Sequence, residues 1–541
     1  KATAAVDDKP WPTGKVEATV VATRTTRPNA YGRSAVEFRG PTAPFFRDLS
    51  LQFDNSRRML VAYDGWGQER WQLSLSEGAQ HENFYSAGAP RAEVEGHLLL
   101  LFQGTKLIAV DTTAASGKAG PRVVWSQDVA NSKAGSVRVL GAGAPRVLPA
   151  LPWRVQAQLG VMGQQLAAVT RRYVCFQRFH NLMALDPANG ETLWMRQDLP
   201  PNCMLFGDEQ FLVVLPPDRD EAMLLRAVDG ELLGTRRIPR IARRPVRTEN
   251  NSLFFSRLDD SCLSSIGHKL LLWWPEGNRR TLTLIDPLEQ RDAWNESRSF
   301  AGKARACVLE NEAVGVLEPD GRFVLIGLHD GRTIADVQLQ PEPNLQEIFL
   351  LSSQGQYFLV TRRSPLVART IRQQPIPGCS VEQIEQGRVY ALDANGKLQW
   401  PAPVELKDQG LLLNQPSRLP VLTFINQSYV QKPNGEGRSS VSLLCVDKRS
   451  GRTLYGGTFG NPTSLFQVTG AEKTNTVNLI MQQKTVTLKF TQEPISAAAA
   501  AGERRSAKPV EKKPSLWESL QKALRGTSQT EKEDKEDEEE S

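Results

Sequence analysis

The chain has 541 residues, which is more than one compact core normally serves, so it predicts several domains or a modular array of repeats. Its 40% hydrophobic and 23% charged residues are ordinary for a globular protein, and the sequence has no run of about 18 apolar residues that would form a membrane-spanning helix. The net charge of +6 is uneven, because eight acidic residues and two lysines lie between Glu531 and Glu540. The rest of the chain is correspondingly basic, which indicates either an acidic partner or an acidic tail that folds back on a basic face.

Cysteine and histidine patterns argue against a metal or redox centre. The six cysteines include no adjacent pair and no C-x-x-C, which disfavours zinc ribbons, thioredoxin-type sites and c-type haem attachment. The five histidines show no metal-ligand spacing, and no G-x-S-x-G, H-E-x-x-H or P-loop motif occurs. We therefore predict no catalytic residue, no cofactor and no metal.

In chain order, residues 1–14 read as a flexible leader and residues 15–25 as a strand. Residues 37–53 carry two further apolar bursts. From there to about residue 494 the pattern is strand, turn, strand and loop, repeated. We expect the sheet structure to close by pairing a strand from residues 15–25 or 50–53 with residues 476–491, because closure removes exposed sheet edges.

The repeat is clearest at residues 184–194, which match the template small-x-Asp-x-x-x-Gly-x-x-x-Trp in full. Five further copies keep most of it, and two degraded copies lie at residues 226–234 and 327–335. The Asp should accept hydrogen bonds from N–H groups of the turn, and the Gly supplies a positive φ. We assign these turn roles to Asp64, Asp111, Asp186, Asp286, Asp393, Asp447, Gly67, Gly190, Gly396 and Gly451.

A Trp at a fixed offset from the turn predicts that each repeat buries it against its neighbour. We expect Trp194→Ala to cost about 3–5 kcal/mol of stability without affecting a binding face. The copies lie about 40 to 75 residues apart, which is typical of one four-stranded blade per repeat.

The segments LMALDPANGETLW (182–194), GRVYALDANGKLQW (387–400) and LLCVDKRSGRTLY (443–455) resemble the pyrroloquinoline-quinone-type (PQQ-like) propeller repeat. This repeat is shared by quinoprotein alcohol dehydrogenases and the eight-bladed lipoprotein of outer-membrane β-barrel assembly. More closely, the whole chain resembles the C-terminal region of large propeller-repeat proteins of planctomycete-type bacteria. The resemblance covers roughly residues 45–490. It implies inter-blade docking by Trp71, Trp125, Trp194, Trp294, Trp400 and, as a weaker substitute, Tyr455. In the two degraded copies, Gly234 and Ala335 stand at the Trp position and put docking in doubt. The vicinal Cys-Cys pair of the quinone-dependent dehydrogenases is missing.

Two segments depart from the repeat. The first, residues 236–247, holds six arginines that are candidates for binding an acidic surface of a partner: Arg236, Arg237, Arg240, Arg243, Arg244 and Arg247. The alternative is a solvated loop with scattered ion pairs. The second is residues 495–541, read as a linker, a short amphipathic helix and a disordered acidic tail. That helix would dock through Leu516, Trp517, Leu520 and Leu524 on a partner, on the flank of the propeller or on a membrane surface, and the alternative is a frayed appendage.

These observations predict an all-β fold: an eight-bladed β-propeller over residues 15–494, with seven blades as the alternative. The leading functional prediction is a non-catalytic scaffold for protein–protein interaction at the bacterial cell envelope. Two alternatives stay open: a quinoprotein-like oxidoreductase or other propeller enzyme, and an extracytoplasmic sensor domain of a larger protein. We expect protein partners and no nucleic acid, because no aromatic residues interleave with the arginines. An extracytoplasmic or periplasmic location is expected, and the sequence leaves a cytoplasmic one open.

Overall fold

The computed structural model of the chain describes residues 11–22, 33–38, 49–54, 57–75, 91–103, 106–113, 120–128, 164–178, 180–200, 203–216, 221–238, 263–294, 296–309, 312–363, 372–373, 376, 379–431, 437–460, 465–481 and 483–494. The chain divides into two compact units. The first comprises Lys1–Trp11 and Val16–Phe490, and the second comprises Pro12–Lys15 and Thr491–Ser541. In the second unit, Gly14 N–H donates to Thr491 O at 3.0 Å, so its two segments pair through their backbones.

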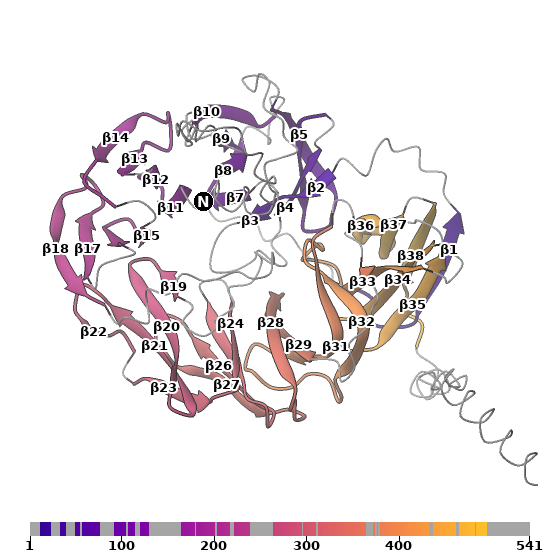
Figure 1. The fold of residues 1–541 in the computed structure, drawn as a ribbon. Helices are drawn as coiled ribbons and strands as arrows, with labels where there is room; N and C mark the ends of the chain where they lie inside the picture. Colours follow the sequence, from indigo (N-terminus) through magenta and orange to yellow (C-terminus); the bar gives the residue numbers. More distant parts are fainter. Residues whose placement is uncertain are drawn as a thin grey trace, which may run out of the picture. The chain divides into compact units, whose positions relative to one another are not determined.

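The described residues form eight sheets, built almost entirely from strands that are consecutive in sequence and antiparallel (Figure 1). The first two sheets contain β2 (Arg33–Ala35), β4 (Leu49–Asp54), β5 (Met59–Asp64) and β6 (Glu69–Ser74), then β3 (Glu37–Phe38), β7 (Arg91–Glu95), β8 (Leu98–Gln103), β9 (Lys106–Asp111) and β10 (Arg122–Asp128). Only β3 and β7 pair in parallel among the named strands.

The next four sheets follow the same plan. They contain β11 (Gln164–Val169), β12 (Val174–Arg178), β13 (Asn181–Leu185) and β14 (Thr192–Arg196); β15 (Met204–Gly207), β16 (Phe211–Leu215), β17 (Glu221–Arg226) and β18 (Leu232–Arg237); β19 (Leu263–Ile266), β20 (Lys269–Glu276), β21 (Arg279–Asp286), β22 (Arg291–Asp292) and β23 (Arg298–Ala301); and β24 (Arg305–Leu309), β25 (Ala313–Leu317), β26 (Arg322–Gly327) and β27 (Thr333–Gln338).

One larger, eight-stranded sheet holds two copies of the repeat, because β32 pairs with strands on both sides. Its strands are β28 (Leu345–Ser353), β29 (Gln356–Arg363), β30 (Arg372–Gln373), β31 (Val381–Leu392), β32 (Val404–Leu412), β33 (Val421–Gln431), β34 (Gly437–Asp447) and β35 (Thr453–Gly460). The last sheet contains β36 (Leu465–Ala471), β37 (Thr476–Met481), β38 (Lys484–Phe490) and β1 (Val16–Ala22), with the short 3-10 helix η4 (Glu472–Thr474) between β36 and β37.

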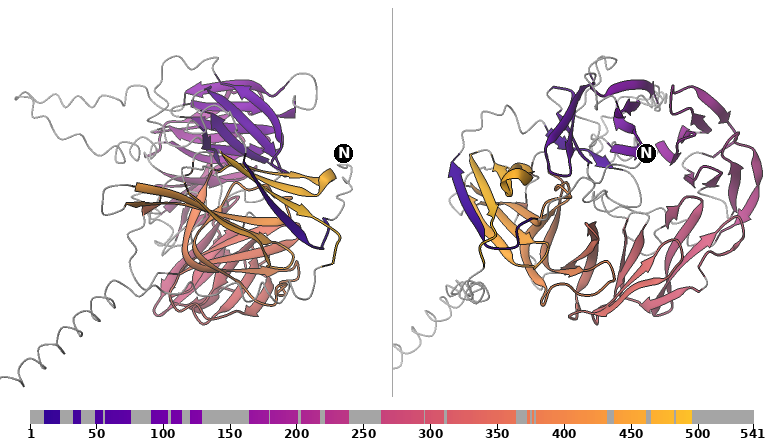
Figure 2. Two further views of the ribbon diagram at one scale, coloured as in Figure 1. Left: turned by 90° about the vertical axis from the view of Figure 1, so that its right-hand side faces the viewer. Right: turned by 180° about the vertical axis from the view of Figure 1, so that it is seen from behind.

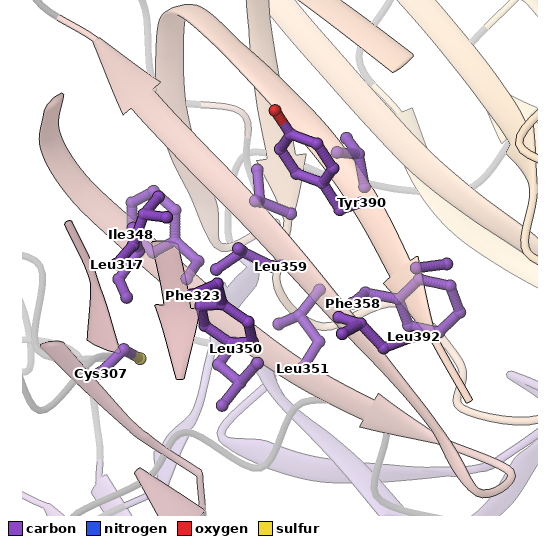
Figure 3. Packing of buried hydrophobic residues seen from close by; sticks show 14 of the residues in the cluster. Cys307, Leu317, Phe323, Ile348, Leu350, Leu351, Phe358, Leu359, Tyr390 and Leu392 are labelled. Atoms are coloured by element: carbon purple, nitrogen blue, oxygen red, sulfur yellow. The ribbon is translucent and has the colours of Figure 1, made fainter. Parts of the chain in front are cut away.

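Strand burial explains why the apolar runs become inner strands. The sequences FLVVL of β16 and AVGVL of β25 are buried along nearly their whole length, as expected for strands covered on both faces by neighbouring sheets. The outer strand β14 instead alternates between exposed and half-buried residues. Figure 3 shows such an interface, where Phe323 of β26 lies in one apolar cluster with Leu350 and Phe358 of the next, eight-stranded sheet.

The predicted closure by the two ends of the repeat region is confirmed. Strand β1 pairs antiparallel with β38, with Val16 opposite Phe490 and Ala22 opposite Lys484. Figures 1 and 2 show the indigo β1 beside the yellow β38. The same sheet contacts the first sheet, because Gly470 N–H donates to Trp66 O at 2.7 Å and Gln68 Nε2 donates to Gly470 O at 2.8 Å.

The described part of the chain is therefore an all-β β-propeller. The eight repeat copies occupy seven of the sheets, and the sheet formed by β36, β37, β38 and β1 carries none. The count of eight blades stays a prediction, because this sheet adds a four-stranded unit beyond the copies. The predicted C-terminal helix and acidic tail lie outside the described residues.

Candidate functional site

The six turn aspartates all make the same hydrogen bond. Each Oδ1 accepts from the backbone N–H two residues further on, at 2.7–2.9 Å, and the donors are Trp66, Thr113, Ala188, Leu288, Asn395 and Arg449. The four predicted turn glycines have φ between 72° and 76°. This is the geometry of an Asx turn closed by a left-handed residue. These carboxylates therefore hold the chain's own backbone.

Four of the repeat tryptophans join one repeat unit to the next. Their Nε1 atoms donate to a backbone carbonyl in the following turn at 2.8–3.0 Å; the pairs are Trp125 with Pro187, Trp194 with Ala227, Trp294 with Leu328 and Trp400 with Lys448. The rings lie over turn glycines, where a Cβ would approach ring atoms to 2.6–2.7 Å; these are Gly190, Gly230, Gly331 and Gly451. These positions therefore require glycine for two reasons: a side chain would clash with the indole ring, and φ is positive.

The remaining template positions behave differently. Trp71 and Tyr455 are half-buried against the apolar clusters of the first and last sheets. Ala335 replaces Trp in a degraded copy and lies against Gly396, where a Cβ would come within 2.3 Å of the alanine Cβ. The turn therefore packs against a methyl group instead of an indole. Gly234 has φ 144°, and the nearest atom to a Cβ there would be Nη1 of Arg236.

A second hydrogen bond accompanies the docking tryptophan in three places, and the sequence did not predict it. Gln127 Nε2, Arg196 Nη1 and Arg298 Nη2 donate to the carbonyls of Gly190, Gly230 and Gly331, at 2.9, 2.9 and 3.0 Å. In the first two copies the donor lies two residues after the Trp, so both side chains point to the same side of the strand. In these two copies, the sequence pattern that could have predicted the second hydrogen bond is Trp-x-Gln or Trp-x-Arg.

A histidine links two neighbouring sheets through the turns between their first two strands. His268 contacts Asp208 through Nδ1 and Asp286 Oδ2 through Nε2, the latter at 3.4 Å. Burial alone would lower the pKa of His268, but the hydrogen bond and the charge of Asp208, together with Asp286, raise it. Burial likewise opposes ionisation of Asp208, yet His268 and two backbone N–H groups bring its pKa down to about 2. The turn is fixed further by the Tyr173 hydroxyl, which donates to Asp208 O.

We expect His268→Gln to destabilise the protein in a pH-dependent way. Because folding raises the pKa of His268, its stabilising contribution is fully present below the unfolded value near 6.5 and is lost as the pH rises through the folded value. Melting temperatures of wild type and variant from pH 5.5 to 9 should therefore converge at the alkaline end. His97→Gln, at an exposed position, is the control. A difference that does not change with pH would contradict the assignment.

The structure describes only the start of the arginine-rich segment. Arg236 and Arg237 end the outer strand β18, where Arg236 is half-buried and Arg237 is exposed. Arg240, Arg243, Arg244 and Arg247 lie outside the described residues, as do Leu516, Trp517, Leu520 and Leu524. The partner-binding roles of the six arginines and of the C-terminal helix therefore stay predictions.

Five large apolar side chains on or next to the outer strands of two neighbouring sheets are exposed, and the sequence did not predict this. We call them the outer-strand patch: Leu193 and Met195 on β14, Val228 in the turn before β18, and Leu232 and Leu233 on β18. Their exposed fractions run from 40 to 68%. The two strands belong to sheets joined by the Trp194–Ala227 and Arg196–Gly230 hydrogen bonds. The repeat pattern did not predict the patch, because the template assigns the same features to every outer strand.

The fold and its turns define a β-propeller built from a repeated Asx turn with a docking tryptophan. No protein-family model matches the chain, and no curated protein matches it. Among solved structures, the chain is similar to BamB from Moraxella catarrhalis (11% identity, 60% of this chain and 81% of that one, TM-score 0.29). It is also similar to the WD40 domain of SCAP from fission yeast (8%, 90% and 99%, 0.34) and to a europium-containing methanol dehydrogenase (9%, 73% and 83%, 0.32). At these identities the likeness concerns the fold alone.

Among the residues that the structure describes, no helix is long and apolar enough to cross a membrane.

Proposed function

We propose that this propeller is a non-catalytic scaffold that binds a protein partner on the outer-strand patch. The observation that carries the proposal is the exposure of five large apolar side chains, 40–68% each, on the outer strands and one turn of two sheets joined by hydrogen bonds. Exposed apolar side chains on neighbouring elements are a feature of interaction surfaces, because leaving them in water costs free energy.

The chemistry of the patch describes its partner. Among the described strands, β14 and β18 are the last of their sheets, so each has one edge of N–H and C=O groups with no described strand beside it in its sheet. Arg236 and Arg237 add positive charge at the end of β18. An extended or helical segment with apolar and acidic residues would satisfy all three features. The patch side chains include no nucleophile and no general base, so we assign binding to this surface and no reaction.

The location of the partner in the cell is a separate part of the proposal. We propose that the partner belongs to the bacterial cell envelope, because the turn and docking residues resemble the propeller repeat of the outer-membrane assembly lipoprotein. Cell fractionation tests this part separately. Recovery of the protein in the cytoplasmic fraction would contradict an envelope location. Binding at the outer-strand patch would still be tested by the next experiment.

The patch is tested by site-specific photo-crosslinking. A photoreactive amino acid placed at Leu193 or at Leu233 should give an adduct with one and the same partner. The matched control position is Thr333, an exposed residue of the outer strand β27, which lies in another sheet. Leu193→Ser combined with Leu233→Ser should then weaken binding of the purified partner by about tenfold or more, since two buried apolar side chains are lost. Equal adduct yields at all three positions would reject the patch.

A further inference from the structure

A fully buried carboxylate orients two arginines at the junction between β27 and the large sheet. Glu342 precedes β28 and has no exposed surface. Its carboxylate accepts from Arg388 Nη1 at 3.1 Å and from Thr361 Oγ1 at 3.3 Å, and it lies 3.3 Å from Arg363 Nε. Its backbone N–H is fixed by Pro319 O at 2.8 Å. Both guanidinium groups are therefore held in place by a carboxylate that is fixed in the protein core.

The outward sides of the same arginines hold a second, different carboxylate. Glu405 on β32 accepts from Arg388 Nε at 2.6 Å with one oxygen and from Arg363 Nη2 at 3.0 Å with the other. Its side chain is 57% exposed, whereas those of Arg363 and Arg388 are 21% and 15% exposed. The inner carboxylate is thus part of the core, and the outer one occupies a position that solvent reaches.

We infer that Arg363 and Arg388 form a binding site for a carboxylate side chain of an acidic partner segment, and that Glu405 occupies this site until the partner displaces it. Two donors from two guanidinium groups, one for each oxygen, match a carboxylate. Glu342 supplies the pre-organisation, so little side-chain entropy is lost on binding. The displaced contact is solvent-exposed, and such ion pairs contribute little to stability. The site lies on other strands than the outer-strand patch and does not depend on it.

Removing the internal occupant tests the site. The probe is a fluorescent, acetylated hexaglutamate peptide, and binding is followed by fluorescence anisotropy at low salt with the full chain. We expect Glu405→Gln to bind the peptide roughly three- to tenfold more tightly than wild type, because one competitor and one negative charge are removed. Added salt should reduce the gain. Glu405→Ala should behave in the same way, and Glu405→Gln combined with Arg363→Gln should lose the gain.

Asp336→Asn is the matched control. Asp336 pairs with Arg322 through two hydrogen bonds at 3.1 and 2.8 Å on β26 and β27, and both side chains are 46% exposed. That variant frees a guanidinium group that also faces Glu318 at 3.7 Å, so we expect no gain in peptide binding. Equal affinities of wild type, both Glu405 variants and Asp336→Asn would overturn the proposal. Stronger binding of Glu405→Gln to anionic lipid vesicles but not to the peptide would also overturn it, by assigning the arginines to lipid headgroups.

Discussion

Trp294→Ala should lower the free energy of unfolding by about 3–5 kcal/mol, the range for truncating a large buried aromatic side chain. Trp294 is 2% exposed, its Nε1 donates to Leu328 O at 2.9 Å, and its ring covers Gly331. The variant would leave a cavity between two sheets and a carbonyl without its donor. Urea denaturation followed by tryptophan fluorescence and circular dichroism measures the loss.

Trp194→Ala is the comparison for this experiment. The sequence assigned the same cost of about 3–5 kcal/mol to it, but the structure leaves its ring half-buried on the outer strand β14. We therefore expect a smaller loss, about 1–3 kcal/mol, since part of the indole surface is already in water. Equal losses for the two variants would show that docking depends on the hydrogen bond more than on burial.

Lys448→Met should stabilise the protein at neutral pH by on the order of 2–4 kcal/mol. The Lys448 side chain is buried, and its Nζ donates to Ser417 O at 2.9 Å and to Ser353 Oγ at 3.2 Å, both uncharged acceptors. Burial lowers the pKa of Lys448 to about 7 from its usual 10.5. The corresponding residue of the other turns is uncharged, and it is apolar at Pro187, Ala227 and Leu328, so a methionine side chain suits the position.

The pH dependence of the two proteins separates this explanation from a general packing effect. Since the folded pKa lies below the unfolded one, the unfolded state binds more protons between about pH 7 and pH 10.5. Wild-type stability should therefore rise with pH across this window relative to Lys448→Met, and the advantage of the variant should shrink. Lys397→Met, at an exposed turn position, should leave the curve unchanged. Parallel curves for wild type and Lys448→Met would contradict a charged, desolvated lysine.

Sequence reasoning succeeded where the chemistry is local. Asp186 and Gly190 lie in one turn, and their spacing determines both the Asx hydrogen bond and the positive φ. The pairing of residues 16–22 with β38 was predicted from the general rule that exposed sheet edges are avoided, because without it the last sheet would keep an uncovered edge. The unusual Lys448 could also have been found from the sequence, because aligning the turns places its charge where the other copies carry an uncharged residue.

The sequence could not predict sites whose partners come from distant strands. Glu342 meets Arg388 across 46 residues, and Glu405 meets Arg363 across 42, in pairings set by β31 and β32. The outer-strand patch depends on which face of β14 and β18 the neighbouring sheet covers, which the repeat template does not distinguish. The arginine-rich segment was visible as composition alone, and a charge run does not specify the surface beside which it begins.

The pairing of β1 with β38 has a consequence for how the chain is made. Strand β38 begins at Lys484, about 460 residues after β1 ends at Ala22. At ~5–20 residues per second, a ribosome needs roughly 20 to 90 s to make the intervening chain. Throughout that time the first strand has no native partner, while the sheets between can already form one after another from neighbouring strands. We therefore expect β1 to pair only after the sheets that lie between it and β38 in the sequence can form, with its edge unpaired in the meantime.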